Sequence, residues 1–404
     1  MLTGNSSDVI VVGAGVVGAA CAYYAAQAGL TVTVIDRGPV AGGTTGTGEG
    51  NLLVSDKEPG PELELALLSV QLWHELAASL PSAIEYEAKG GLVVASSDDG
   101  LRALRGFAAR QGEVGVTAHE VPADGLGELE PHLSPGLPGG IHYPQDAQVQ
   151  PALAAAHLLK AAASQGRNQP RSRSRPRLRL RLGEEVTGLL TGADGAVRGV
   201  RTATGEVRAP YVVNAAGTWG GDLAKLAGVE LPVLPRRGFV LVTEPLPRVV
   251  RRKVYAADYV ADVASGSAAL QTSAVVEGTA AGPVLIGSSR ERVGFDRSLS
   301  TEVLRRLALG ATALFPVLAG VRVMRTYTGF RPYLPDHLPA IGPDPRLPGL
   351  LHACGHEGAG VGLAPATGLA IARCLTGGEP PVDIAPFAPA RFGPEPLGPG
   401  PRAA

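Results

Sequence analysis

The sequence predicts an α/β protein in which a Rossmann-like domain is interrupted by a second, α+β domain built on an antiparallel sheet. Three observations lead to this fold class. Strand-like apolar runs alternate with helical patterns at the start of the chain, which is typical of a parallel sheet covered by helices. Two stretches, 86–145 and 226–324, instead resemble short strands and turns. A length of 404 residues is also long for a single core.

The N-terminal strand leads directly into a glycine-rich turn. Strand, turn, second strand and acid follow in order: residues 8–12, Gly13, Gly15, Gly18, residues 30–35 and Asp36. Gly13 permits the tight turn, Gly15 lets backbone approach a pyrophosphate, and Gly18 allows close packing of helix on strand. Asp36 can accept hydrogen bonds from ribose hydroxyls. The pattern predicts a dinucleotide site that also includes Val16, Val17 and Arg37.

The same N-terminal stretch has a second interpretation as a membrane span. Residues 9–26 carry no charged side chain, and about 18 apolar residues are the threshold for a transmembrane helix. The stretch is rich in glycine and alanine, however, and residues 1–8 contain no Lys or Arg, which disfavours a secretion signal. A buried parallel strand followed by a buried helix explains it better. We therefore expect a soluble protein without an integral membrane segment.

The net charge and the cysteine content bear on which ligands, cellular compartment and metal or disulfide sites we expect. The formal net charge is −1, so no global field attracts nucleic acid or an anionic membrane. Cys21, Cys354 and Cys374 are an odd, sparse set without metal-ligand spacing. They predict a reducing, cytoplasmic location, no disulfide framework and no metal site.

An arginine-rich segment at 167–181 is the local exception to the neutral charge. A nucleic-acid patch is one interpretation, but no aromatic residues are interleaved for base stacking. The alternative is a solvated loop at 165–176, followed by a half-exposed strand at 177–182 with its leucines facing inward.

The remaining elements are placed by periodicity and turn residues. In an expected helix at 63–80, Leu63, Leu67, Val70 and His74 fall on one side. The other expected elements are helices at 151–164, 300–315 (capped by Ser300) and 361–375, a hairpin at 185–200, and strands at 211–217 and 350–355. The Rossmann-like domain is expected to comprise 1–85, 146–225 and 325–392, and the second domain 86–145 and 226–324. A Pro/Gly-rich tail at 393–404 is expected to be disordered.

These motifs resemble the D-amino-acid oxidase family of FAD-dependent oxidoreductases, which includes glycine oxidase and sarcosine oxidase. Within the family the chain most resembles the β-subunit type of hydroxyproline, proline and opine dehydrogenases and of hydrogen cyanide synthase. The resemblance covers residues 8 to about 392. It implies a Rossmann-like FAD-binding domain of the glutathione-reductase type. FAD is expected to be noncovalent, because Arg325-Thr326-Tyr327 lacks the cysteine that bonds flavin in monomeric sarcosine oxidase.

The resemblance also assigns further cofactor contacts. A loop along the pyrophosphate and flavin supplies Gly43, Thr44, Thr45, Gly48, Glu49, Gly50 and Asn51. Adenine is expected at Val186, and a small-residue turn beside the cofactor supplies Ala216, Gly217 and Trp219. The segment that reaches the flavin ring comprises Gly355, His356, Glu357, Gly358, Gly360 and Val361. A helix that begins near Gly360 would direct its positive end at the flavin N1/C2 carbonyl region.

Arg331 is the main catalytic candidate. In glycine oxidase and D-amino-acid oxidase, the arginine of a matching Gly-x-Arg-Pro segment binds the substrate carboxylate, and a guanidinium can form two parallel charge-assisted bonds. A structural ion pair is the alternative. His356 could tune the flavin or touch substrate, and Tyr255 and Tyr259 could line the substrate face, although such tyrosines are often packing residues. His352 is expected to be buried beside the last strand.

The predicted activity is oxidation of the C–N bond of a small amino or imino acid, with oxygen or a partner subunit accepting the electrons in a possible hetero-oligomer. Glycine specificity is not implied, because 356–360 lacks the second arginine of glycine oxidase. Glu49 and Asn51 match the dehydrogenase β-subunit type instead. Two rivals stay open: an NAD-dependent dehydrogenase, since the same glycine pattern serves NAD, and a non-catalytic FAD-binding subunit.

Overall fold

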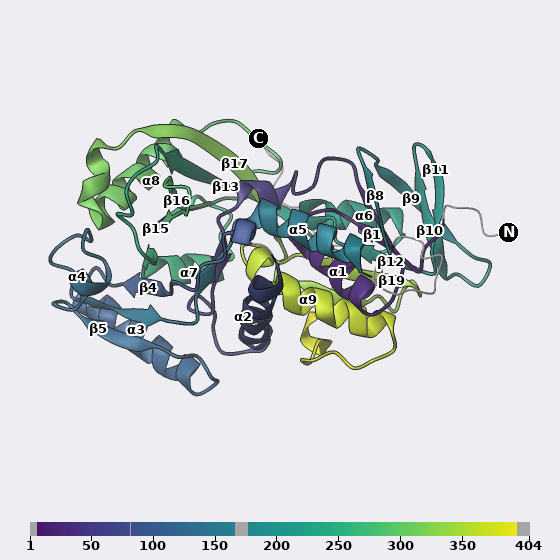
Figure 1. The fold of residues 1–404 in the computed structure, drawn as a ribbon, viewed down its shortest axis with the longest axis horizontal. Helices are drawn as coiled ribbons and strands as arrows, with labels where there is room; N and C mark the ends of the chain where they lie inside the picture. Colours follow the sequence, from purple (N-terminus) through teal and green to yellow (C-terminus); the bar gives the residue numbers. More distant parts are fainter. Residues whose placement is uncertain (1–5, 81, 166–176, 394–404) are drawn as a thin grey trace.

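The computed structural model describes residues 6–80, 82–165 and 177–393. Two large sheets organise this part of the chain, one of six strands and one of eight (Figure 1). The expected arginine-rich loop at 165–176 and the expected tail at 393–404 lie almost entirely outside the described residues. The remaining arrangement confirms the predicted class, a Rossmann-like domain combined with a largely antiparallel second sheet.

The six-stranded sheet contains the predicted N-terminal strand at its centre. In spatial order its strands are β18 (Ala340–Pro343), β19 (Leu350–Cys354), β12 (Tyr211–Asn214), β1 (Val9–Val12), β2 (Val32–Asp36) and β8 (Leu178–Leu182). All neighbours are parallel except β18 and β19. β1 and β19 are buried along their whole length, which explains their uninterrupted apolar sequences. The carboxyl ends of β1, β2 and β12 meet at one edge of the sheet.

Four helices pack beside this sheet: α1 (Val16–Gln27), α2 (Pro61–Ser79), α5 (Pro151–Ser164) and α9 (Gly360–Leu375). α1 contacts both α5 and α9, and α2 lies on the other side of α9 (Figure 1). The first and last helices of the chain approach closely because their contact residues are small. A Cβ at Gly368 would lie 2.6 Å from the carbonyl carbon of Ala20. The two ends of the sequence are thus joined in one core.

Smaller sheets complete the same region. β9 (Val186–Thr191), β10 (Val197–Thr202) and β11 (Gly205–Arg208) form an antiparallel sheet, which confirms the predicted hairpin. β3 (Asn51–Leu52) pairs with β7 (Ala147–Gln148).

The eight-stranded sheet is antiparallel except where β14 meets β4. Its order is β17 (Val323–Tyr333), β13 (Leu234–Thr243), β16 (Val284–Arg290), β15 (Gln271–Gly278), β14 (Lys253–Ala256), β4 (Gly91–Val94), β6 (Gly139–Tyr143) and β5 (His119–Pro122). Its helices are α3 (Asp98–Gly112), α4 (Leu126–Leu129), α7 (Asp258–Ala264) and α8 (Thr301–Leu314). The Ser300 hydroxyl accepts a hydrogen bond from the Val303 N–H, as predicted for the cap of α8.

The structure corrects the expected region of short strands and turns at 86–145, which contains the long helix α3. The signal for this helix was present in the sequence. Ser97 caps it by accepting from Gly100 N–H, and Asp98 and Asp99 occupy its first turn.

On the side of the helix at 63–80 that has the expected apolar spacing, Leu63 is buried, Leu67 and Val70 are half-buried against the core, and His74 is exposed. The buried residues of α2 include Leu65, Ser69, Trp73 and Leu76. The helix is rotated because it packs on α9: Ser69 Oγ donates to Gly362 O over 2.6 Å, and Trp73 Nε1 donates to Val361 O over 3.0 Å.

Two further expectations differ from the structure. Leu180 and Leu182 are 45% and 43% exposed rather than inward-facing, because β8 is the edge strand and only Leu178 reaches the core. β17 belongs to the eight-stranded sheet, although the expected boundary assigned residues from 325 onward to the Rossmann-like domain. β17 is placed in this sheet by its pairing with β13, which runs from the pair Leu234 and Tyr333 to the pair Thr243 and Val323. The other domain boundaries stay predictions.

Within the described residues, no helix has the length and apolar character needed to cross a bilayer.

Candidate active site

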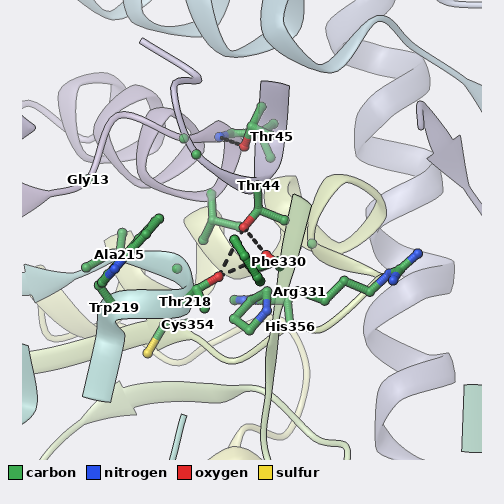
Figure 2. A pocket seen from close by; sticks show the side chains of 18 of the residues that line it. Gly13, Thr44, Thr45, Ala215, Thr218, Trp219, Phe330, Arg331, Cys354 and His356 are labelled. Carbon is green, nitrogen blue, oxygen red and sulfur yellow. Dashed lines mark hydrogen bonds between the residues drawn. The ribbon is translucent and has the colours of Figure 1, made fainter. Parts of the chain in front are cut away.

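A cavity of about 520 Å³ lies where the two large sheets meet (Figure 2). Its walls come from the carboxyl edge of the six-stranded sheet, the loop at 42–51, strands β13 and β17, and the turn before α9. All predicted cofactor and catalytic residues line this cavity except Gly18, Gly50 and Gly355. Segments more than 300 positions apart in the sequence therefore share one site.

The glycine turn after β1 has the geometry that its sequence predicts. Gly13 has φ +118°, and a Cβ there would lie 2.2 Å from Ala215 O. A Cβ at Gly18 would lie 2.0 Å from Gly13 O, so Gly18 serves packing and does not face the cavity. Gly15, Val16 and Val17 line the cavity at the N-terminus of α1. Backbone N–H groups at such a helix start favour a phosphate.

Asp36 stands at the end of β2, on the cavity wall. Its Oδ2 accepts from Ala14 N–H and its Oδ1 from Gly38 N–H, both over 2.7 Å. These bonds fix the carboxylate beside the glycine turn. Each oxygen has a second lone pair, so hydroxyl groups of a ribose can still be accepted.

The neighbouring wall has the character of an adenosine site. Val186 lines it at the start of β9, together with Ala216, Gly217 and Trp219. The Arg37 guanidinium lies 4.4 Å from the centre of the Trp219 ring and 3.3 Å from Glu185. The result is a half-open apolar slot with a cation at its edge, and it lies next to Asp36.

The loop at 42–51 is held to both sheets. Thr45 Oγ1 accepts from Val16 N–H over 3.0 Å. Thr44 Oγ1 donates to Phe330 O over 2.6 Å, and Thr218 Oγ1 donates to the same oxygen over 2.9 Å (Figure 2). The loop is thereby connected both to the glycine turn and to the strand that carries Arg331.

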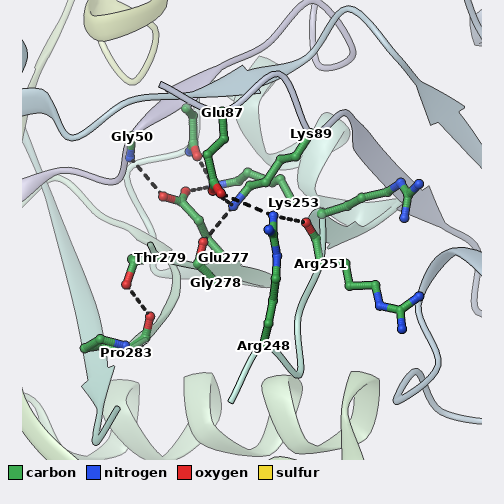
Figure 3. Close-up of polar contacts among 12 residues, drawn as sticks. Gly50, Glu87, Lys89, Arg248, Arg251, Lys253, Glu277, Gly278, Thr279 and Pro283 are labelled. Carbon is green, nitrogen blue, oxygen red and sulfur yellow. Dashed lines mark hydrogen bonds and ion pairs between the residues drawn. The ribbon is translucent and has the colours of Figure 1, made fainter. Parts of the chain in front are cut away.

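The last residues of the loop are held by a buried ionic network (Figure 3). Lys253 Nζ lies 2.8 Å from Glu277 Oε2 and 3.8 Å from Glu49 Oε2, and it also donates to Asn51 Oδ1. Burial alone would lower the pKa of Lys253, but the two carboxylates outweigh it and raise the pKa. Glu49 and Asn51 line the cavity, whereas Gly50 packs against Val149 O. The expected contact of Gly50 with the cofactor is therefore corrected to a packing role.

The turn before α9 closes the opposite end of the cavity. Gly358, Gly360 and Val361 line it at the N-terminus of this helix. Gly355 does not; its φ of +82° lets it pass Leu334, where a Cβ would lie 2.2 Å from Leu334 Cδ1. This end of the cavity has the positive helix terminus that was predicted to face a flavin ring.

His356 lines the cavity but is 3% exposed. Its Nε2 lies 3.0 Å from Thr367 Oγ1, inside α9. Burial lowers the pKa of His356 to about 3. The imidazole is therefore neutral near pH 7, which suits hydrogen bonding and packing more than proton transfer; its predicted catalytic role stays a prediction.

Arg331 extends from β17 into the cavity (Figure 2). Its Nη1 donates to Ser289 O over 2.8 Å. Across residues 6–80, 82–165 and 177–393, no carboxylate lies within 4.0 Å of its guanidinium. Burial, reinforced by the charge of Arg290, lowers the pKa of Arg331 to about 10, so it is still a cation at neutral pH. An arginine without an acidic partner beside a cavity is suited to an anionic ligand.

The two candidate tyrosines differ. Tyr259, in α7, lines the cavity and is 7% exposed; burial raises its pKa. Tyr255 is fully buried, does not line the cavity, and its hydroxyl shares a hydrogen bond with Ser55, so it has the packing role that was the alternative for these tyrosines. His352 is buried in β19 between Asn214 and Asp344, as predicted.

Glu357 belongs to an ionic group at the cavity wall. It binds Arg236, and its Oε2 lies 3.0 Å from His337 Nδ1. Burial would raise its pKa, but the bond from His337 and the charge of Arg236 lower it overall. Glu357 is thus ionised and already paired.

Sequence reasoning missed several residues of this region. Thr218 lies inside the predicted turn at 216–219 but was not singled out as a site residue. Arg236, Arg290 and Arg297 lie in or beside the cavity walls, and no local motif marks them. Only strand pairing reveals Arg236, which stands opposite Arg331 in the register of β13 and β17.

The arrangement fits an extended FAD molecule. A glycine turn and helix start are present for the pyrophosphate, an acid for the ribose, a half-open slot for adenine, and a second helix start for the flavin. Gly43 and Gly358 line the cavity, and a Cβ there would lie in ordinary contact with the cavity-lining residues Trp219 at 3.5 Å and Arg331 at 3.7 Å. Among the described residues no His, Cys, Asp and Glu side chains are grouped as a metal site.

Comparison with known proteins gives a consistent assignment. A family model described as DAO, FAD dependent oxidoreductase, matches residues 8–374. Glycine oxidase of Pseudomonas aeruginosa is 33% identical over 95% of this chain and 99% of its own length. Hydrogen cyanide synthase subunit HcnC of that species is 30% identical over 96% and 97%. The crystal structure of glycine oxidase from Geobacillus kaustophilus matches with a TM-score of 0.84 at 26% identity, covering 96% of this chain and 99% of that one. The chain therefore belongs to the DAO family of FAD dependent oxidoreductases.

Proposed function

We propose that this protein oxidises the C–N bond of a small amino or imino acid to an imine. The observation that carries the proposal is Arg331, a cavity-lining guanidinium without an acidic partner among the described residues. A carboxylate would supply that partner and would be oriented by two parallel hydrogen bonds. Relatives named glycine oxidase, sarcosine dehydrogenase and iminodiacetate oxidase support the same substrate class.

Residues of this chain divide the work between cofactor and substrate. Gly13, Gly15, Asp36, the cavity-lining residues of the loop 43–51 and the N-terminus of α9 would hold FAD noncovalently. Bound FAD supplies the two-electron, hydride-accepting chemistry. Arg331 would hold the substrate carboxylate, so that the carbon bearing the amine has one defined position. Tyr259 would cover the substrate and limit access of water.

We assign no proton-transfer role to His356 or Glu357, the histidine and the glutamate of the cavity wall near Arg331. His356 is neutral and bonded to Thr367, and Glu357 is ionised and paired with Arg236. The substrate nitrogen is therefore proposed to react as the free amine, whose proton has already passed to water.

The names of the relatives are the basis for what we propose about the electron acceptor and the assembly. We propose that a partner subunit or oxygen reoxidises the flavin, because HcnC is named as a subunit whereas glycine oxidase is named as an oxidase. A cytoplasmic location belongs to the same proposal. Reduction of the holoprotein by its substrate without air, followed by admission of air, separates the two acceptors: rapid return of flavin absorbance indicates an oxidase.

The decisive experiment is anaerobic titration of the purified holoprotein with amino and imino acids. Bleaching of flavin absorbance, at about 450 nm for oxidised flavin, is expected with at least one of them. Arg331→Met should retain FAD and raise the substrate KM about 100-fold, since a charged hydrogen-bonded pair contributes about 3 kcal/mol. Arg325→Met, on the exposed part of the same strand, is the matched control and should behave as wild type. Unchanged KM in Arg331→Met would remove Arg331 from the site.

The same preparation tests both rivals. A colourless, folded protein that binds NAD and not FAD would support a nicotinamide dehydrogenase. A yellow protein that no amino or imino acid reduces would support a non-catalytic flavin subunit.

A further inference from the structure

Arg290, at the end of β16, is another arginine without an acidic partner among the described residues, and it lies next to Arg331. The two are linked through the backbone, because Arg331 Nη1 donates to the carbonyl of Ser289, the residue before Arg290. No carboxylate lies within 4.0 Å of the Arg290 guanidinium in the described part of the chain. The positive charge of Arg290 also lies close enough to contribute, after burial, to the lowered pKa of Arg331.

The surroundings of Arg290 leave its charge poorly compensated. The residue is 4% exposed, and its Nε has no hydrogen-bond partner within the described part of the chain. Its Nη2 donates to Ser288 Oγ over a long 3.4 Å. Its guanidinium lies 4.9 Å from the centre of the Tyr259 ring, whose side chain lines the cavity. Arg290 is therefore separated from the cavity by Tyr259.

Neighbouring arginines are paired with carboxylates, as is usual for a buried positive charge. Arg236 is buried and bonded to Glu357. Arg237 has two carboxylate partners, Glu291 at 2.8 Å and Asp296 at 2.6 Å. Glu357, Glu291 and Asp296 are thus paired with other cations, and Glu49 Oε2 lies 3.8 Å from Lys253 Nζ. Buried charges are normally paired. The guanidiniums of Arg290 and Arg331 have no carboxylate within 4.0 Å among the described residues, and a ligand could supply one.

We propose that the substrate carries two carboxylates, one held by Arg331 beside the reacting carbon and the second by Arg290 at the Tyr259 side of the cavity. This inference rests on the proposed function and narrows its substrate class to amino or imino diacids. Tyr259 would turn aside, or relay the contact through its hydroxyl, when the diacid binds. Arg290 would then determine specificity without taking part in the chemistry.

The test compares substrates matched in everything except the second carboxylate. N-methylglycine and iminodiacetate share a secondary amine and a CH2 beside one carboxylate; alanine and aspartate form the primary-amine pair. Anaerobic flavin reduction by the wild-type holoprotein is expected to show a KM about tenfold or more lower for a diacid than for its partner, as for one charge-assisted hydrogen-bonded pair. The preferred pair tells whether the second carboxylate is attached through nitrogen or through the side chain.

Binding without turnover gives a second measurement. Acetate, malonate, succinate and glutarate are titrated against the flavin spectrum, and at least one diacid should bind about tenfold more tightly than acetate. In Arg290→Met the preference for diacids should vanish for substrates and inert acids alike. The KM and dissociation constants of monocarboxylates should stay within about twofold of wild type. Arg290→Lys should keep part of the preference for diacids. Arg292→Met removes a charge two positions away and should keep the whole preference.

Three results would overturn the inference. The wild type could show no preference for any diacid, Arg290→Met could weaken mono- and dicarboxylates equally, or Arg290→Lys and Arg290→Met could be equally impaired because the residue only supports the fold. In each case reduction of the flavin by N-methylglycine or alanine would leave the proposed function intact. If neither class of acid reduces the flavin or binds, the proposed function fails together with this inference.

Discussion

The side-chain hydroxyl of Thr44 donates a hydrogen bond to the main-chain carbonyl oxygen of Phe330 over 2.6 Å, across 286 positions of sequence. Phe330 immediately precedes Arg331, so the loop expected along the cofactor is bonded to the strand that positions the candidate substrate ligand. Thr218 donates to the same oxygen from a third segment. Cofactor loop and substrate residue are therefore expected to be coupled in energy as well as in position.

Replacing Thr44 and Thr218 tests this coupling. Thr44→Val or Thr218→Val alone should weaken FAD binding about fivefold, as for one hydrogen bond of about 1 kcal/mol. The double variant should lose more than the sum, because the buried Phe330 carbonyl then has neither hydroxyl donor. FAD dissociation constants from apoprotein reconstitution give the comparison. Thr187→Val, at an exposed strand position, is the control; strictly additive losses would count against the coupling.

Gly13 should tolerate no side chain. In Gly13→Ala the new Cβ would meet Ala215 O at 2.2 Å in a backbone with φ +118°, so we expect loss of bound FAD and a drop in Tm. Gly195→Ala is matched for a positive φ, +76°, but has open space around the new Cβ. It should cost about 1 kcal/mol of stability and leave FAD content unchanged. Normal flavin content in Gly13→Ala would contradict the close approach.

Binding of carboxylates should depend on pH through Arg331. Its pKa is lowered to about 10, so the cation that binds an anion is present below that pH and is lost as pH rises through it. Acetate affinity, followed by the flavin spectrum, should be flat from pH 7 to about 9 and fall at higher pH. Arg331→Lys replaces the titrating guanidinium with an amine and should change the pH at which acetate affinity falls. A decline centred near pH 7 would point to another residue.

His356 should make the fold sensitive to acid. Its pKa is about 3 in the folded protein, against about 6.5 when exposed. The unfolded chain therefore binds a proton that the folded chain does not, and stability falls as pH decreases below about 6.5. His356→Gln should reduce that loss by about 3 kcal/mol between pH 6.5 and pH 4, as measured by urea unfolding. His74→Gln, on the exposed side of α2, should leave the slope unchanged.

Much of the Rossmann-like half could be predicted from residues alone, because its signals are local. The turn Gly13–Gly18 and Asp36 are set by backbone sterics that act within one strand–helix–strand unit. The helix at 151–164 and the cap at Ser300 were found for the same reason. Arg331 was recognised through the Gly-x-Arg-Pro resemblance, and its position on the cavity wall agrees with that prediction.

What periodicity could not provide were relationships that arise when distant segments pack. The buried side of α2 is chosen by α9, nearly 300 positions later, and β17 is drawn to the eight-stranded sheet by ten residues of pairing with β13. Arg290, unlike Arg331, belongs to no sequence motif. It stands out only in the folded protein, where the neighbouring Arg236 and Arg237 bind carboxylates and Arg290 binds none among the described residues. Local patterns encode the preferences of single elements, whereas the partners of a buried charge depend on which elements meet, and that is settled only when the whole chain folds.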